Sequence, residues 1–213
     1  MHNAAFQLPV WFDLGATFAF ALTGAIAAIH RGYDIVGVFF LALASGLGGG
    51  LIRDGVFISG GGPTPLLSDP RYIEVVVAAT VAGALLGRHI KRFHRVIAVI
   101  DALGLGAYAA FGVQKSLHAG LAVPAAILVG VVNASGGGLL RDVLTGEEPL
   151  VFKPGQFYVL AAVVGAVAFV FFTVSLEFAP TPAAIASVAL TFVFRMLSIV
   201  LNWRTAPVSA ING

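Results

Sequence analysis

The chain has 213 residues, of which 59% are hydrophobic and 10% charged; its net charge is +2 and it has no cysteine. Soluble domains carry about 25% charged residues, so this composition excludes a water-soluble globule and indicates lipid as the solvent. The lack of cysteine excludes disulfides and zinc–thiolate sites, and the small, dispersed charge argues against a nucleic-acid partner.

Seven segments approach the roughly 20 apolar residues that a membrane-spanning helix needs. The first, 8–29, has no basic residues before it and no clear cleavage site after it, so we expect a retained helix rather than a signal peptide. The connections are short, and nothing resembles a linker between domains. We therefore predict an all-α membrane protein with a single transmembrane domain, 1–213, whose spans are 8–29, 35–58, 72–87, 96–114, 119–140, 157–176 and 182–203.

The distribution of basic residues predicts the orientation. With seven spans, one side of the membrane holds only Arg71 and Lys115, whereas the other holds a dense basic cluster over 88–95 (RHIKRFHR) and Lys153. The positive-inside rule then places the N-terminus outside and the C-terminus in the cytoplasm. The same cluster also fits a docking patch for anionic lipid headgroups, so bound membrane lipid is a second interpretation beside topology.

An internal repeat divides the chain. Residues 13–54 align with 101–142 without a gap, with 12 of the 42 positions identical, including an intact GGGLxRD frame. Each copy holds three spans, an odd number, so the second copy starts from the opposite side of the membrane and the two are inverted. The expected organisation is repeat 1, repeat 2 and a seventh helix outside the repeat: 8–87, 96–176 and 182–203.

A glycine triplet lies inside the second and the fifth span, and Ser45 and Asn133 align three residues before the two triplets. Close helix packing through small residues would explain glycines here. We favour a kink or break that frees backbone groups toward a cavity, because three glycines cost roughly 1 kcal/mol each relative to alanine. Gly46 and 60–62 add to the first triplet; the pore or kink candidates are Gly48, Gly49, Gly50, Gly136, Gly137, Gly138, Ser45, Asn133, Thr17 and Tyr108.

Charged residues inside the spans are the stronger signal, because a buried Arg or Asp costs a few kcal/mol and usually faces a polar interior. At about 1.5 Å per residue, the two Arg–Asp pairs lie on opposite sides of the bilayer midplane. We expect the ion pairs Asp13–Arg53 and Asp101–Arg141, which would leave the two following aspartates free to face water. Arg195 would then take one of the inner aspartates, in a stabilising or a conducting role. The set is Asp13, Arg53, Asp54, Asp101, Arg141, Asp142 and Arg195.

Uncharged polar residues fit a sparse pore lining, although such a residue taken singly more often forms a hydrogen bond between helices; besides the candidates above they include Thr23. No HExxH, GxSxG or Walker loop occurs, so we expect no enzyme. His30 and His118 fall in turns, so no metal set and no cofactor is expected.

The duplicated GGGLxRD frame, 88 residues apart in a seven-span chain, resembles the TRIC family of trimeric intracellular cation channels, in particular its prokaryotic members. The resemblance covers essentially the whole chain, including Arg195 and Trp203. It implies a homotrimer in the prokaryotic plasma (inner) membrane, with one potassium-permeable pore per subunit flanked by 48–50 and 136–138. The lysine-rich tail of eukaryotic members is missing, so neither the reticulum location nor phosphoinositide binding is carried over.

The predicted function is a monovalent cation channel, chiefly for potassium, in which the Asp54 and Asp142 carboxylates select for charge sign. No segment resembles a TVGYG filter, so strong selection of potassium over sodium is not expected. The alternative is a secondary transporter of a small solute such as a neutral amino acid, since inverted repeats with broken helices serve carriers equally well. A structural scaffold would not explain the buried charges.

Overall fold

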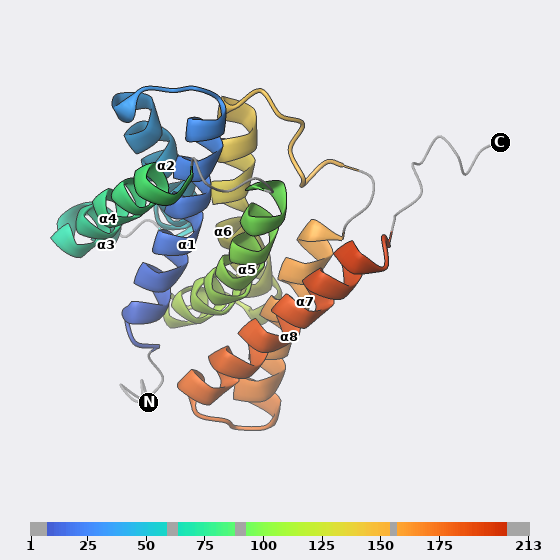
Figure 1. Ribbon diagram of the computed structural model, residues 1–213. Coiled ribbons are helices and arrows are strands. Elements are labelled where there is room, and N and C mark those ends of the chain that lie inside the picture. Colours follow the sequence, from blue (N-terminus) through green and yellow to red (C-terminus); the bar gives the residue numbers. More distant parts are fainter. Residues whose placement is uncertain (1–7, 59–63, 88–92, 154–156, 204–213) are drawn as a thin grey trace.

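The computed structural model describes residues 8–58, 64–87, 93–153 and 157–203, and the described chain is helical throughout its regular parts (Figure 1). Two of the α-helices continue as five-residue π-helical turns, η2 and η4. The elements are α1 (Trp11–His30), α2 (Ile35–Ile52), η2 (Arg53–Phe57), α3 (Pro65–Ser68), α4 (Pro70–Leu86), α5 (Phe93–His118), α6 (Val123–Leu144), α7 (Tyr158–Val170), η4 (Phe171–Ser175) and α8 (Pro180–Val200).

Six of the described helices are long and apolar enough to cross a membrane: α1, α2 with η2, α5, α6, α7 with η4, and α8. Helix α4 has 17 residues and lies against the whole length of α1. Tyr72 near its start contacts Asp13, whereas Gly87 just past its end lies against Ile29. Helix α4 therefore runs parallel to α1 and covers the same depth.

Several helix boundaries differ from the predicted spans by two to four residues, and the starts of α5 and α6 bear on the site. Helix α5 begins at Phe93, so Asp101 lies two turns inside it rather than at its start. Helix α6 begins at Val123 rather than at residue 119, because the preceding turn needs Gly120 in the left-handed region (φ 83°). Gly32, its equivalent in the first copy, has φ 76° in the matching turn. Glycine therefore occurs at this position in both copies because both copies contain the same left-handed turn.

The helices do not break at the glycine triplets, so of the predicted kink or break only a kink stays a prediction. Helix α2 continues through Gly48–Gly50 to Ile52, and α6 continues through Gly136–Gly138 to Leu144. The irregular turn in the first copy is η2, which starts at Arg53, after the triplet. A membrane helix keeps its backbone hydrogen bonds unless a cavity or a neighbour offers the freed groups other partners, and the space beside these glycines is filled by packed neighbours instead of a cavity. Residues 60–62 lie outside the described residues.

Helices α1 and α5 form the centre of the molecule and run in opposite directions (Figure 1). Thr17 of α1 meets Tyr108 of α5, while Phe20, later in α1, meets Gly104, earlier in α5. One apolar cluster joins α1, α2 and α4, and a second joins α5, α6, α7 and α8 and also contains Phe12, Ala16 and Phe20 of α1. The first three long helices and the next three thus pack as two units across the α1–α5 contact, and α8 packs outside them.

Candidate functional site: two buried charged clusters across a glycine contact

The two glycine triplets touch each other where α2 crosses α6. A Cβ added to Gly49 would lie 2.1 Å from the carbonyl oxygen of Asn133, and one added to Gly137 would lie 2.1 Å from the carbonyl oxygen of Ser45. The two contacts exchange under the 88-residue offset of the repeat. The triplets therefore let two helix backbones meet directly, which is the packing role of small residues in membranes.

Two further hydrogen bonds repeat in the same way. The Ser45 hydroxyl donates to the Phe20 carbonyl oxygen at 2.8 Å, and the Asn133 amide donates to the Tyr108 carbonyl oxygen at 2.7 Å. Phe20 and Tyr108 are equivalent positions, and their rings stack at 5.4 Å. These polar residues join α2 to α1 and α6 to α5, so they hold each unit together beside the glycine contact.

Tyr108 also bridges the two units. Its hydroxyl donates to the Gly46 carbonyl oxygen at 2.5 Å and shares a hydrogen bond with the Thr17 hydroxyl at 2.7 Å. All three groups are buried, and a buried hydroxyl needs such partners. In this structure Thr17 and Tyr108 therefore act as helix-to-helix contacts.

The first charged cluster consists of Asp13, Arg53 and Asp54. Arg53 is fully buried and forms an ion pair with Asp13 at 3.5 Å. Its Nε and Nη2 donate to the two carboxylate oxygens of Asp54 at 2.7 and 3.1 Å. Phe111 packs against the guanidinium, 5.3 Å from carbon to ring centre, and Lys115 donates to Asp54 at 2.8 Å. Two carboxylates and two cations thus balance in charge.

The second charged cluster consists of Asp101, Arg141 and Asp142. Arg141 Nη1 donates to Asp101 at 2.9 Å and to the Thr23 hydroxyl at 3.0 Å, while its Nε donates to Asp142 at 3.0 Å. Thr23 occupies the position equivalent to Phe111. Each arginine is therefore supported by the same position of the opposite unit.

These contacts confirm the predicted Asp13–Arg53 and Asp101–Arg141 pairs and correct the prediction for the following aspartates. Asp54 and Asp142 are not free: both are buried and both pair with the arginine that precedes them. Adjacent residues do point about 100° apart on a helix, but the arginine side chain is long enough to fold back onto its neighbour. Asp142 also accepts from the Leu150 amide at 3.1 Å.

Two tyrosines complete the clusters and were missed by the sequence analysis. Tyr72, near the start of α4, donates to Asp13 at 2.6 Å. Tyr158, the first residue of α7, lies buried beside Asp101. Its hydroxyl oxygen packs against Gly138, and a Cβ added to that glycine would lie 2.6 Å from it. Both tyrosines stand at the start of the third helix of their repeat, and this shared position is the sequence pattern that would have predicted them as cluster residues.

Arg195 of α8 is buried, and its guanidinium lies over the Tyr158 ring, 5.2 Å from its centre. Asp101 is the carboxylate whose charge acts on it. The prediction that Asp142 or Asp101 supplies a carboxylate to Arg195 stays a prediction, and the contact with Tyr158 joins α8 to α7.

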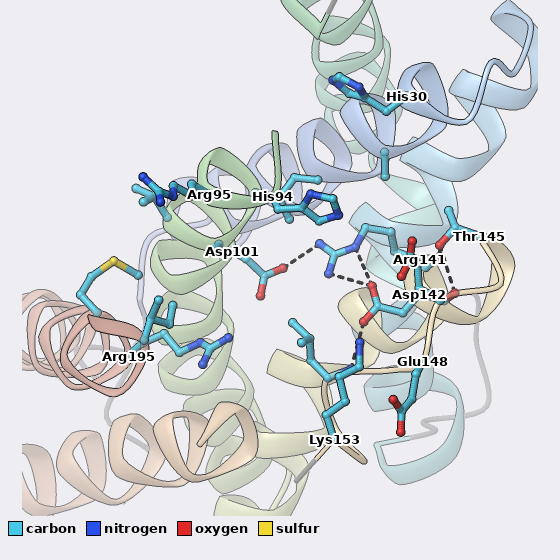
Figure 2. Close-up of a pocket in the computed structure, with 18 of the residues that line it drawn as sticks. His30, His94, Arg95, Asp101, Arg141, Asp142, Thr145, Glu148, Lys153 and Arg195 are labelled. Atoms are coloured by element: carbon cyan, nitrogen blue, oxygen red, sulfur yellow. Dashed lines mark hydrogen bonds and ion pairs between the residues drawn. The ribbon is translucent and has the colours of Figure 1, made fainter. Parts of the chain in front are cut away.

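A cavity of about 740 Å³ reaches the second charged cluster (Figure 2). Figure 2 shows Asp101, Arg141 and Asp142 at its wall, with Arg195 entering from α8 and His30 from α1. Of the basic cluster 88–95, residues 88–92 lie outside the described residues. The remaining charged lining comprises Arg31, His94, Arg95, Glu147, Glu148 and Lys153.

Exposed ion pairs lie at both ends of the helices. Arg31, after α1, pairs with Glu147, after α6. At the other end, Arg71 hydrogen-bonds to Asp69 at the start of α4, and this guanidinium holds the pKa of the Asp69 carboxyl below its usual range. Such pairs contribute little stability, so the buried clusters remain the functional candidates.

Comparison with known proteins supports the same architecture. A family model described as "Glycine transporter" matches residues 10–88 and 98–174. The chain is 30% identical over 198 residues to the UPF0126 inner membrane protein YadS of Escherichia coli, covering 91% of this chain and 92% of that one. It is 31% identical over 157 residues to a UPF0126 membrane protein of Deinococcus radiodurans, covering 73% and 72%.

Solved structures agree closely with the fold. The TRIC trimeric intracellular cation channel orthologue from Rhodobacter sphaeroides superposes with a TM-score of 0.84 at 31% identity, over 90% of this chain and 97% of that one. A prokaryotic TRIC channel superposes with a TM-score of 0.79 at 26% identity, over 90% and 95%.

The molecule is thus an all-α multi-pass membrane protein with the TRIC fold. It belongs to the prokaryotic TRIC family, the family of the UPF0126 membrane proteins, as the resemblance implied. The solved relatives are cation channels, so the family is not one of enzymes.

Proposed function

We propose that the chain is a potassium-permeable cation channel with one pore in each subunit of a homotrimer. The observation that carries this proposal is the pair of buried Asp–Arg–Asp clusters on either side of the glycine contact, one of them reached by the cavity. Buried charges at this density mark an ion path rather than a lipid-facing surface. The channel function of the solved TRIC relatives, and their trimeric assembly, supports it.

The proposed path runs from the cavity past the second charged cluster, between the triplets, and past the first charged cluster. Asp54 and Asp142 supply negative charge at its two ends, and no segment of the sequence resembles the TVGYG filter that separates potassium from sodium. Gly49 and Gly137 lie in direct backbone contact, so conduction requires α2 and α6 to move apart there. The triplets are the proposed constriction.

The proposed topology has seven spans, with α4 as the third, an external N-terminus and a cytoplasmic C-terminus. It divides the chain into inverted repeats over 8–87 and 96–176, followed by the seventh helix. The antiparallel α1 and α5, and the two separate segments that the family model matches, favour this division. The inner-membrane name of YadS favours the prokaryotic plasma membrane. In the proposed orientation the cavity opens toward the cytoplasm.

Single-channel recording from the purified protein in planar bilayers with asymmetric potassium chloride tests the function. We expect unitary currents that reverse near the potassium potential. Asp142→Asn should lower the unitary conductance several-fold, because it removes a carboxylate from the cavity wall. Glu177→Gln, in an exposed turn, is the matched control and should leave it unchanged. Silent bilayers would contradict the channel.

A secondary transporter of a small neutral amino acid is the second candidate, and two observations favour it. The matched family model is described as a glycine transporter. The cavity also carries basic and acidic side chains together, which suits a zwitterion. Saturable glycine uptake into proteoliposomes whose bilayers are silent would establish the carrier and overturn the channel.

A further inference from the structure

The two units differ at one position beside their charged clusters. Residue 27 of α1 and residue 115 of α5 are equivalent under the 88-residue offset, as are Asp54 and Asp142. The first unit carries alanine there and the second carries lysine. The reciprocal contacts of Gly49 and Gly137 support the alignment in space, so the comparison concerns the same place in two copies of one fold.

In the first charged cluster this position is filled. Lys115 donates from its ammonium to Asp54 Oδ2 at 2.8 Å, and 25% of its side chain is exposed, against 5% for Asp54. The long side chain therefore covers the aspartate and takes the contact with water in its place. Phe111, one turn deeper on α5, is only 9% exposed.

In the second charged cluster the same position is open. Ala27 lines the cavity of about 740 Å³ together with Asp142. The corresponding oxygen of Asp142, Oδ2, accepts a hydrogen bond from the Leu150 backbone amide instead of from a lysine. With a methyl group in place of a lysine side chain, the cavity reaches Asp142, whose side chain is 10% exposed against 5% for Asp54.

We propose that Lys115 is a gate over the first charged cluster, and that the Ala27/Lys115 difference decides which end of the path opens to water. The path through the clusters is part of the proposed function, but access of water to them can be measured without transport. For ions or solute to pass the first charged cluster, the Lys115–Asp54 pair must break and the lysine must swing outward.

Accessibility of single cysteines tests the gate, because the chain has no native cysteine. In a Phe111→Cys background, Lys115→Ala should raise the rate of modification by a charged, water-soluble thiol reagent by about tenfold, as expected when one ion pair no longer favours the closed state. Lys115→Arg keeps the charge and should leave the rate low. Equal rates with and without Lys115 would overturn the proposal.

The reciprocal substitution should close the open end. In a Thr145→Cys background, at the cavity wall, Ala27→Lys should lower the modification rate by about tenfold by pairing with Asp142. Ala27→Met adds bulk without charge and should have a smaller effect, and adding Asp142→Asn to Ala27→Lys should restore the rate. A rate unchanged by Ala27→Lys would overturn the proposal. Either experiment decides alone if the other variant does not fold, and neither depends on whether the protein conducts ions.

Discussion

Seven charged side chains lie buried between the described helices, and each aspartate of the two clusters pairs with an arginine. Arg53 and Arg141 each hold two carboxylates, and both contact the opposite unit: Arg53 at Phe111 and Asn133, Arg141 at Thr23. Removing one partner of such a pair leaves an uncompensated charge in a medium of low dielectric constant. At the residue scale, stability therefore depends on complete clusters.

Asp101→Asn should destabilise the protein by about 3–5 kcal/mol, because it leaves Arg141 without its 2.9 Å partner and removes the carboxylate that acts on Arg195. Thermal unfolding in detergent measures this. Glu147→Gln breaks only the exposed pair with Arg31 and should cost less than about 1 kcal/mol. The double variant Asp101→Asn/Arg141→Met should cost less than the sum of its parts; additive losses would contradict the pairing.

Tyr72→Phe should destabilise the protein by about 1–3 kcal/mol, because it removes the 2.6 Å hydrogen bond to a buried carboxylate. Tyr33→Phe is a suitable control, since its hydroxyl is exposed and only 3.4 Å from the Leu144 carbonyl oxygen. The same unfolding measurement compares them. Equal stability of the two variants would show that Tyr72 does not support the first charged cluster.

The sequence predicted the arginine partners but not the tyrosines. Aspartate and arginine stand out in an apolar span because of their cost in lipid, and their estimated depth in the bilayer placed each beside its partner. Tyr72 and Tyr158 are ordinary residues near the ends of apolar segments, so only the approach of the third helix of each unit identifies them. The prediction that Asp54 and Asp142 face water was wrong, because the spacing of residues along a helix does not account for the length of the arginine side chain.

At the scale of elements, hydropathy predicted the six described helices that are long and apolar enough to cross a membrane, but not the role of the glycine triplets. A run of glycines in a helix allows either a break or close packing of another helix, and the sequence alone does not distinguish the two. The neighbour decides: α6 supplies a carbonyl oxygen opposite Gly49, and α2 supplies one opposite Gly137. The fold pairs the two triplets, which removes the reason for a break in either helix.

Gly49→Ala and Gly137→Ala should each destabilise the protein by about 1–3 kcal/mol, since the added methyl would lie 2.1 Å from a backbone oxygen and force α2 and α6 apart. Gly15→Ala is the control: a methyl group added there would meet no atom within 4 Å, and alanine favours the helix by about 1 kcal/mol. Unfolding temperatures in detergent compare the three. A stable Gly49→Ala variant would contradict the direct backbone contact.

At the scale of the whole molecule, the orientation can be tested because the chain contains no cysteine. A membrane-impermeant maleimide applied to intact cells should label an Ala119→Cys variant in the turn between α5 and α6, but not a Tyr33→Cys variant in the turn between α1 and α2. Both positions are exposed, so both should be labelled once the membrane is permeabilised. The opposite pattern would reverse the proposed topology.

The reciprocal glycine contact has a consequence for the origin of the chain. Because Gly49 meets residue 133 as Gly137 meets residue 45, each unit presents the same surface to the other, as in a two-fold symmetric dimer. Two separate copies of one three-helix peptide, inserted in opposite directions, would form the same contact. In such a dimer residues 27 and 115 would be one position, so both faces of the membrane would be chemically equal. Only two separately encoded copies allow the two faces to differ, as alanine and lysine do here.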